Sequence, residues 1–129
     1  MVKITAVIPA LNEEKTLKEV LIKTSKHVSE IILIDDASIN GTKQIARETG
    51  AIVLSHKKSE GYDKAINDGF KLAAQCGSDI IVTLDADGQH NPEEIPSIVE
   101  PIMNNEADVV VGKRPRCSRI SEYFFSLIG

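Results

Sequence analysis

The sequence predicts an α/β fold, with helices on both faces of a mostly parallel sheet. Short runs of β-branched and aliphatic residues alternate with stretches whose apolar residues recur at helical spacing. The run IILI at 31–34 is continuously apolar, as is typical of a strand that is covered on both sides. The chain has 129 residues and no internal repeat or linker, so residues 1–129 are predicted to form one domain.

Each predicted strand is a short apolar run bounded by polar or turn-forming residues. In chain order, the predicted strands are Lys3–Ile8, Glu30–Ile34, Ala51–Ser55, Asp79–Leu84 and Ala107–Val111.

Helix signals fall between these strands. Asn12 is expected to cap the first helix, because the two glutamates after it would lie in the first turn, where the helix dipole favours negative charge. A short helix is predicted over Thr42–Thr49, with Gly50 at its C-terminal cap. A third helix closes near Gly77. The sequence Asn91-Pro92-Glu93-Glu94 supplies an N-cap, a proline at N1 and a glutamate at N3, and so begins a fourth.

Composition excludes several function classes. A net charge of -4 gives no general attraction to nucleic acid or to an anionic membrane. The two cysteines have no metal-type spacing and are interpreted as free thiols, although a disulfide stays open. No leader-like segment and no apolar run of about 20 residues is present. We therefore expect a cytoplasmic protein, with the cytoplasmic face of a membrane as one location.

Charged groups follow the ends of the predicted strands. The first strand runs into 9–13 (PALNE), the second into 35–38 (DDAS), the fourth into 85–87 (DAD) and the fifth into 112–114 (GKR). In open α/β sheets, ligands bind beyond the carboxyl ends of the strands. Acidic groups at two strand ends and basic groups at a third indicate a charged ligand that is accompanied by a cation.

Asp85 and Asp87 are the clearest candidates for cation binding. In an extended chain, residues i and i+2 point to the same side, and with Gln89 the pair would form an oxygen-rich site suited to Mg²⁺ or Mn²⁺. Such an ion can clamp a diphosphate and stabilise its departure. The alternative is a simple turn before the helix, although Asn91 already supplies that cap. His90 could approach a metal or sugar, but a lone loop histidine is more often incidental.

Two other segments have both a structural and a functional interpretation. Residues 35–42 favour a turn into a helix, and an aspartate there could also accept hydrogen bonds from a nucleobase or ribose. Residues 61–65 (GYDKA) could form a phosphate-binding turn, but they match neither the P-loop nor the dinucleotide fingerprint. His27 and His56 have no partner that the sequence makes visible.

Four segments together resemble the family 2 inverting glycosyltransferases, which have the Rossmann-like GT-A fold. They are VIPALNEE (7–14), IDDAS (34–38) with Gly41-Thr42, DADGQH (85–90) and ADVVVGKR (107–114). The DADGQH form looks most like the polyprenyl-phosphate sugar transferases, the dolichol-phosphate mannosyltransferase group. The resemblance implies transfer of a sugar from a GDP- or UDP-sugar to a polyprenyl (dolichyl) phosphate. It also implies that this chain is the N-terminal nucleotide-binding portion of such an enzyme.

The resemblance further implies the roles of individual residues. Asp85 and Asp87 are the implied catalytic residues, and Asp85, Asp87 and Gln89 the implied ligands of Mg²⁺ or Mn²⁺. The implied substrate-binding residues are Pro9, Leu11, Glu13, Ile34, Asp36, Asp85, Ala86, Asp87, Gln89 and Arg114. Leu11 stands where many relatives carry tyrosine. A phosphate acceptor is already anionic, which agrees with the lack of an obvious general base.

Two other functions stay open at this point. One is a module that binds nucleotide without turnover, and the other is a sugar-1-phosphate nucleotidyltransferase. The second is disfavoured because the N-terminal segment lacks a glycine-rich basic loop for a triphosphate.

The final segment, 114–129, combines three arginines with a short aromatic and aliphatic stretch. One hypothesis is an interfacial helix that contacts lipid, which would give peripheral membrane contact. The other is a helix that packs on more protein or on a second copy of the chain, which would make a homo-oligomer.

Overall fold

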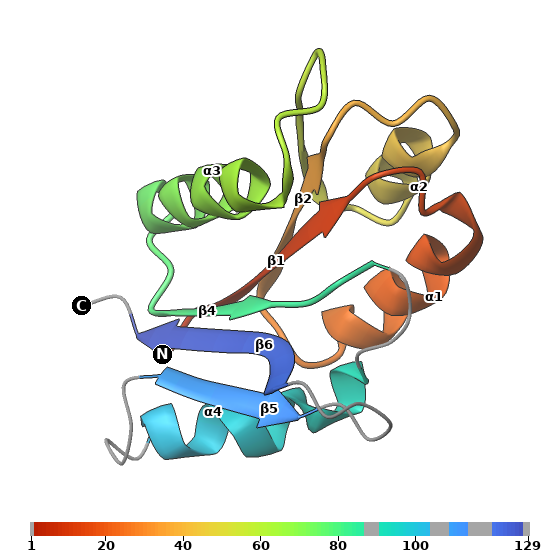
Figure 1. Ribbon diagram of the computed structural model, residues 1–129. Coiled ribbons are helices and arrows are strands. Elements are labelled where there is room, and N and C mark those ends of the chain that lie inside the picture. Colours follow the sequence, from red (N-terminus) through yellow and green to blue (C-terminus); the bar gives the residue numbers. More distant parts are fainter. Residues whose placement is uncertain (1, 87–90, 104–108, 114–119, 128–129) are drawn as a thin grey trace.

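The computed structural model describes residues 2–86, 91–103, 109–113 and 120–127, and it contains one six-stranded sheet (Figure 1). The strands are β1 (Ile4–Ala10), β2 (Glu30–Asp35), β3 (Ile52–Ser55), β4 (Ile80–Thr83), β5 (Val109–Lys113) and β6 (Ile120–Leu127). Their spatial order is β3-β2-β1-β4-β6-β5. The first four strands pair in parallel, and β6 lies antiparallel between β4 and β5. The predicted mostly parallel α/β architecture is confirmed.

The helices lie on both faces of this sheet, as predicted (Figure 1). They are α1 (Glu14–Ser25), α2 (Thr42–Glu48), α3 (Tyr62–Gln75), the short 3-10 helix η1 (Pro92–Glu94) and α4 (Ile95–Met103). Helix α3 covers one face, and α1, α2 and α4 cover the other. Among the described helices, none is both long enough and apolar enough to cross a membrane.

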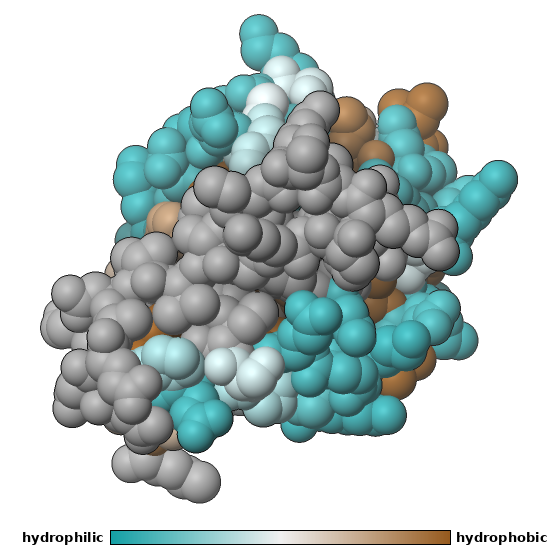
Figure 2. Space-filling model, turned by 60° about the horizontal axis from the view of Figure 1, so that its bottom comes forward, coloured by the Kyte–Doolittle hydropathy of each residue, from teal (hydrophilic) through white to brown (hydrophobic). Residues whose placement is uncertain are grey.

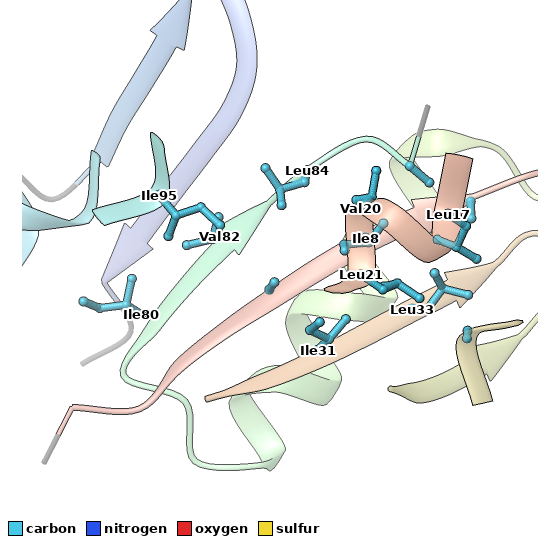
Figure 3. Close-up of a cluster of buried hydrophobic side chains, with 14 of the residues drawn as sticks. Ile8, Leu17, Val20, Leu21, Ile31, Leu33, Ile80, Val82, Leu84 and Ile95 are labelled. Atoms are coloured by element: carbon cyan, nitrogen blue, oxygen red, sulfur yellow. The ribbon is translucent and has the colours of Figure 1, made fainter. Parts of the chain in front are cut away.

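Alternation along each strand sends neighbouring side chains to opposite faces of the sheet and creates two apolar clusters. On β1, Ala6 and Ile8 face the cluster beneath α1, whereas Val7 faces the cluster beneath α3. Figure 3 shows the larger cluster, in which Leu17 and Leu21 of α1 pack over the sheet. On the face turned forward in Figure 2, most of the described surface is hydrophilic.

The helix caps were predicted correctly in one case and wrongly in another. Asn91 caps η1 with its side chain, which accepts a hydrogen bond from the Glu93 amide at 3.1 Å. Asn12 does not cap α1. The helix begins one residue later, with Glu13 at the N-cap, because Asn12 adopts a left-handed backbone with φ 56°. This conformation frees the Asn12 side chain for the neighbouring loop, where it accepts from the Ile39 amide at 2.9 Å.

The prediction of a helix within 114–129 is wrong for residues 120–127, which form strand β6. The segment ISEYFFSL is rich in aromatic residues, which favour strands over helices. Strand β6 also pairs with the free edge of β4, from Ile80 opposite Leu127 to Val82 opposite Phe125. This pairing agrees with the strand preference of the segment and places β6 between β4 and β5. Residues 114–119 and 128–129 lie outside the described part of the chain.

Helix α3 approaches the sheet at Gly69, and this contact gives a stability prediction. A Cβ atom at Gly69 would lie 2.3 Å from Val7 Cγ1 and 3.3 Å from Ile34 Cγ1. We expect Gly69→Ala to lower the free energy of unfolding by about 1–3 kcal/mol, because the helix would have to move away from β1 and β2. Urea unfolding followed by circular dichroism measures the change.

Two further variants make this test specific. Asn67→Ala, at an exposed position of the same helix, should leave stability nearly unchanged. In the double variant Val7→Ala with Gly69→Ala, the smaller side chain at position 7 makes room for the new methyl group. The loss of stability should therefore be smaller than the sum of the losses in the two single variants. A loss that is purely additive in the double variant would argue against the close contact.

Candidate functional site

A pocket of about 340 Å³ opens at the edge of the sheet where the parallel strands end. The carboxyl ends of β1, β2 and β4 all point toward this side of the molecule (Figure 1). The pocket is lined by Pro9, Ala10, Leu11, Glu13, Asp36, Ser59, Gly61, Tyr62, Ala65, Asp85 and Ala86. Its location is the one that the strand-end argument predicts.

The structure brings together six of the residues assigned from the sequence. These pocket-lining residues are Pro9, Leu11, Glu13, Asp36, Asp85 and Ala86. Ile34 is different, because its side chain is fully buried in the cluster beneath α3 and does not line the pocket. Asp87, Gln89 and Arg114 lie outside the described residues.

The carboxylate of Asp36 has four hydrogen-bond partners at the pocket. Its Oδ1 accepts from the Glu60 amide and lies against His56 Nδ1, each at 2.8 Å. Its Oδ2 accepts from the Ser59 hydroxyl at 2.8 Å and from the Gly61 amide at 3.1 Å. Asp36 therefore fastens the connection between β3 and α3, which supplies one wall of the pocket.

These bonds also set the protonation state of Asp36. Burial acts to raise the pKa of the carboxyl group. The Glu60 amide, His56, the Ser59 hydroxyl and the Gly61 amide outweigh that effect and hold the pKa at about 2, below the ordinary value of 3.8. The group is therefore a permanent anion at neutral pH.

The same bonds change the interpretation of the turn at Gly61. This residue has φ 93° and ψ 166°, a backbone conformation that is nearly exclusive to glycine. The amides of Glu60 and Gly61 both donate to Asp36, so neither is directed at a phosphate. The turn is built around the carboxylate of Asp36 instead.

The opposite wall depends on the loop between β2 and α2. Ala37 has a left-handed backbone with φ 67° and follows directly on Asp36. The Ser38 hydroxyl accepts from the backbone amide of Asn12 at 2.8 Å, and Thr42 Oγ1 accepts from the backbone amide of Glu13 at 3.0 Å. These bonds hold the segment after β1 against the segment after β2, which places Glu13 at the pocket.

Asp85 reaches the pocket from the end of β4. It is partly buried, and the chain around it is held on both sides. The Leu84 amide donates to Val7 O at 3.3 Å, and the Thr16 hydroxyl donates to Ala86 O at 2.6 Å. Within the described ranges, no three acidic, histidine or cysteine side chains gather as a metal site. Of the three predicted metal ligands, Asp85 lies at the pocket, whereas Asp87 and Gln89 lie outside the described part of the chain.

His56 is the main residue of this site that had no assigned role from sequence. It directly follows β3 and lies between two carboxylates, with Nε2 2.8 Å from Asp68 Oδ2. The hydrogen bond with Asp36 raises the pKa of His56, burial opposes this, and Asp68 raises the pKa further. Ligands bind beyond the carboxyl ends of parallel strands, and His56 directly follows the carboxyl end of β3. The same rule could therefore have identified His56 from the sequence. His27 instead pairs with Glu93 at 2.9 Å, away from the pocket.

The family described as "Glycosyl transferase family 2" matches this chain over residues 5–125, which is nearly its whole length. The chain belongs to this family. The match runs through the segments after β1, β2 and β4 that form the pocket, and it confirms the resemblance found in the sequence.

Relatives in this family include named sugar transferases. The chain is 36% identical over 126 residues to UDP-N-acetylglucosamine–dolichyl-phosphate N-acetylglucosaminyltransferase of Methanococcus voltae, covering 84% of this chain and 50% of that protein. It is 33% identical over 120 residues to dolichol-phosphate mannosyltransferase of Pyrococcus furiosus, covering 87% of this chain and 33% of that protein. The chain spans about half the length of the first curated relatives it matches.

A solved structure extends the comparison to three dimensions. Glucosyl-3-phosphoglycerate synthase from Mycobacterium tuberculosis, in complex with UDP, matches with a TM-score of 0.69 and 29% identity, over 84% of this chain and 42% of that one. Another structure of that protein contains Mn²⁺, UDP-glucose and phosphoglyceric acid, with a TM-score of 0.67 and 28% identity, over 81% of this chain and 41% of that one. The fold of the chain is therefore that of a GT-A glycosyltransferase.

The low pKa of Asp36 predicts how stability depends on pH. Because the folded value of about 2 lies below the ordinary 3.8, the ionised carboxylate stabilises the fold above pH 3.8, and this contribution is lost as the pH falls toward 2. We expect this loss to be about 2 kcal/mol. Urea unfolding of the wild type and of Asp36→Asn should show a difference in stability that shrinks as the pH is lowered through this range.

Asp63→Asn provides the matched control, because Asp63 is an exposed carboxylate in the first turn of α3. Its difference from the wild type should change much less over the same pH range. A pH-independent difference for Asp36→Asn would contradict the assigned role of the carboxylate.

Proposed function

We propose that this chain is the donor-binding portion of a glycosyltransferase that transfers a sugar from a nucleoside-diphosphate sugar to a polyprenyl (dolichyl) phosphate. The observation that carries the proposal is the pocket at the strand ends, because three of the four segments that bear the family likeness contribute residues to its lining. The names of relatives that act on dolichyl phosphate support the lipid acceptor. A cytoplasmic location at the face of a membrane belongs to the same proposal.

The size and the walls of the pocket support a nucleotide as its ligand. A volume of about 340 Å³ lies within the range of small-molecule sites. Pro9, Leu11 and Tyr62 supply apolar surface against which a flat base can pack. The bonds of Asp36 hold that carboxylate and the Ser59 hydroxyl in place at the pocket, which favours one orientation of the ligand.

The charge of the pocket supports a metal-dependent donor. Its described lining contains three carboxylates, Glu13, Asp36 and Asp85, and no lysine, arginine or histidine. A diphosphate brought near such a surface is repelled unless a cation lies between the two. Carboxylate oxygens suit Mg²⁺ or Mn²⁺.

In this proposal, Asp85, Asp87 and Gln89 hold the metal, and Arg114 approaches the donor. The bound ion would supply charge neutralisation for the departing diphosphate. Mn²⁺ in a related structure with UDP-glucose supports this assignment without choosing between the two metals.

The reaction itself needs little proton transfer. An oxygen of the acceptor phosphate forms the new bond to the anomeric carbon as the bond from that carbon to the donor diphosphate breaks, with inversion. The electron pair leaves with the nucleoside diphosphate. Because the acceptor oxygen is already anionic, the protein's main contributions are to hold the donor and to exclude water from it.

Calorimetric titration with UDP and with GDP, each with and without Mn²⁺, tests donor binding. We expect one nucleotide to bind in a metal-dependent way, and Asp85→Asn and Asp87→Asn each to weaken binding at least about tenfold, since a charged metal ligand is lost. Glu48→Gln, at an exposed position on α2, is the matched control and should bind like the wild type. Equal affinity with and without metal would contradict the proposed charge compensation.

Transfer of labelled sugar to polyprenyl phosphate tests the activity. Transfer that requires both the metal and Asp85 would support the whole proposal. Nucleotide binding by a folded chain with no transfer would support a binding module instead.

A further inference from the structure

His56 lies outside the pocket lining, yet it connects the three elements that form one pocket wall. Its side chain is only 6% exposed. Nδ1 lies 2.8 Å from Asp36 Oδ1 at the end of β2, and Nε2 lies 2.8 Å from Asp68 Oδ2 in the middle of α3. His56 itself directly follows β3.

The partners of His56 require a particular protonation state. An ionised carboxylate is only an acceptor, so both ring nitrogens must donate, which only the imidazolium can do. A neutral ring would direct a lone pair at one of the two carboxylates, and one of the two bonds would be lost. Hydrogen bonding to Asp36, opposed by burial and reinforced by Asp68, raises the pKa of His56 above its ordinary 6.5.

The other charged groups around the ring favour the same state. Glu60 Oε2 lies 3.6 Å from Nδ1 and adds negative charge. Lys64 lies 3.1 Å from Asp68 Oδ1 and keeps that carboxylate ionised. The pKa of Asp68 is lowered by its hydrogen bonds with His56 and then with Lys64. The imidazolium is therefore held between anions that stay charged at neutral pH.

The two partners of His56 connect it to residues that form one wall of the pocket. Asp36 also receives the Ser59 hydroxyl and the Gly61 amide, and both of these residues line the pocket. Asp68 lies three residues after Ala65, which lines the pocket from α3. Losing either bond of His56 would loosen one end of this wall while leaving the pocket's composition unchanged.

We propose that His56, as the imidazolium, is a positioning residue for the donor pocket, which joins Asp36 to Asp68 and so fixes the 59–61 turn against α3. This inference rests on the proposed function, because the ligand concerned is the nucleoside diphosphate of the donor. His56 touches neither the donor nor a metal in this proposal, and it acts through Asp36.

Two substitutions separate the two bonds of the ring. His56→Asn retains a donor near the position of Nδ1 and can still reach Asp36, whereas His56→Gln retains one near the position of Nε2 and can still reach Asp68. His27→Gln is the matched control, since His27 pairs with Glu93 away from the pocket. Unfolding curves for every variant identify those that remain folded.

Affinity for the nucleotide and Mn²⁺ is then measured by calorimetry from pH 6 to pH 9. We expect the wild type and His27→Gln to lose affinity, roughly tenfold, as the pH rises above the raised pKa of His56. His56→Asn should bind nearly as well as the wild type at low pH, and His56→Gln should bind several-fold more weakly. Both His56 variants should lack the pH-dependent loss. A pH profile that is the same in the wild type and in both His56 variants would overturn the inference.

A measurement without ligand distinguishes failure of this inference from failure of the proposed function. In NMR spectra of the free chain, the amides of Glu60 and Gly61 should shift in step with the titration of His56, and their hydrogen exchange should rise more steeply with pH in the wild type than in His56→Gln. If no nucleotide binds at any pH, the proposed function fails, and these amides alone decide whether His56 fixes the turn. Amides that do not respond to His56 would overturn the inference.

Discussion

A carboxylate that is withdrawn from water has to be compensated by hydrogen bonds, and the shape of the candidate site follows from how Asp36 meets this requirement. Donors come from the turn before α3 and from His56 after β3. Satisfying one charge therefore joins the ends of β2 and β3 to the start of α3. Within the turn, the backbone amides of Glu60 and Gly61 both donate to Asp36, which fixes the turn at this wall of the pocket.

Much of this arrangement could be predicted from sequence, because it follows from local rules. Parallel strands deliver their carboxyl ends to one edge, so Glu13, Asp36 and Asp85 were expected together, and they meet at the pocket. The cap at Asn91 was also predictable, since it depends on residues only two apart. Local chemistry and strand direction were sufficient for these features.

The features that were missed depend on contacts between distant parts of the chain. His56 has partners 20 residues before it and 12 after it, which no local pattern indicates. The strand β6 exists because β4 has an open edge, although its sequence alone also allowed a helix. Asn12 looks like a helix cap, but its bond to Ile39 competes successfully for its side chain. Only at Asn12 does a long-range hydrogen bond outweigh a local preference; at His56 and β6 the long-range partners add what the local sequence leaves undecided.

The charge balance of the pocket unites the donor proposal with the role of His56. Three carboxylates line the described pocket, and the imidazolium behind Asp36 offsets one of them. Loss of the proton from His56 would loosen the 59–61 turn. At the same time, it would make the surroundings of the diphosphate more negative. The two effects have the same sign, so neither can mask the other. Added metal would oppose only the second effect. A loss of affinity at high pH that persists at saturating metal would therefore arise from the position of the wall.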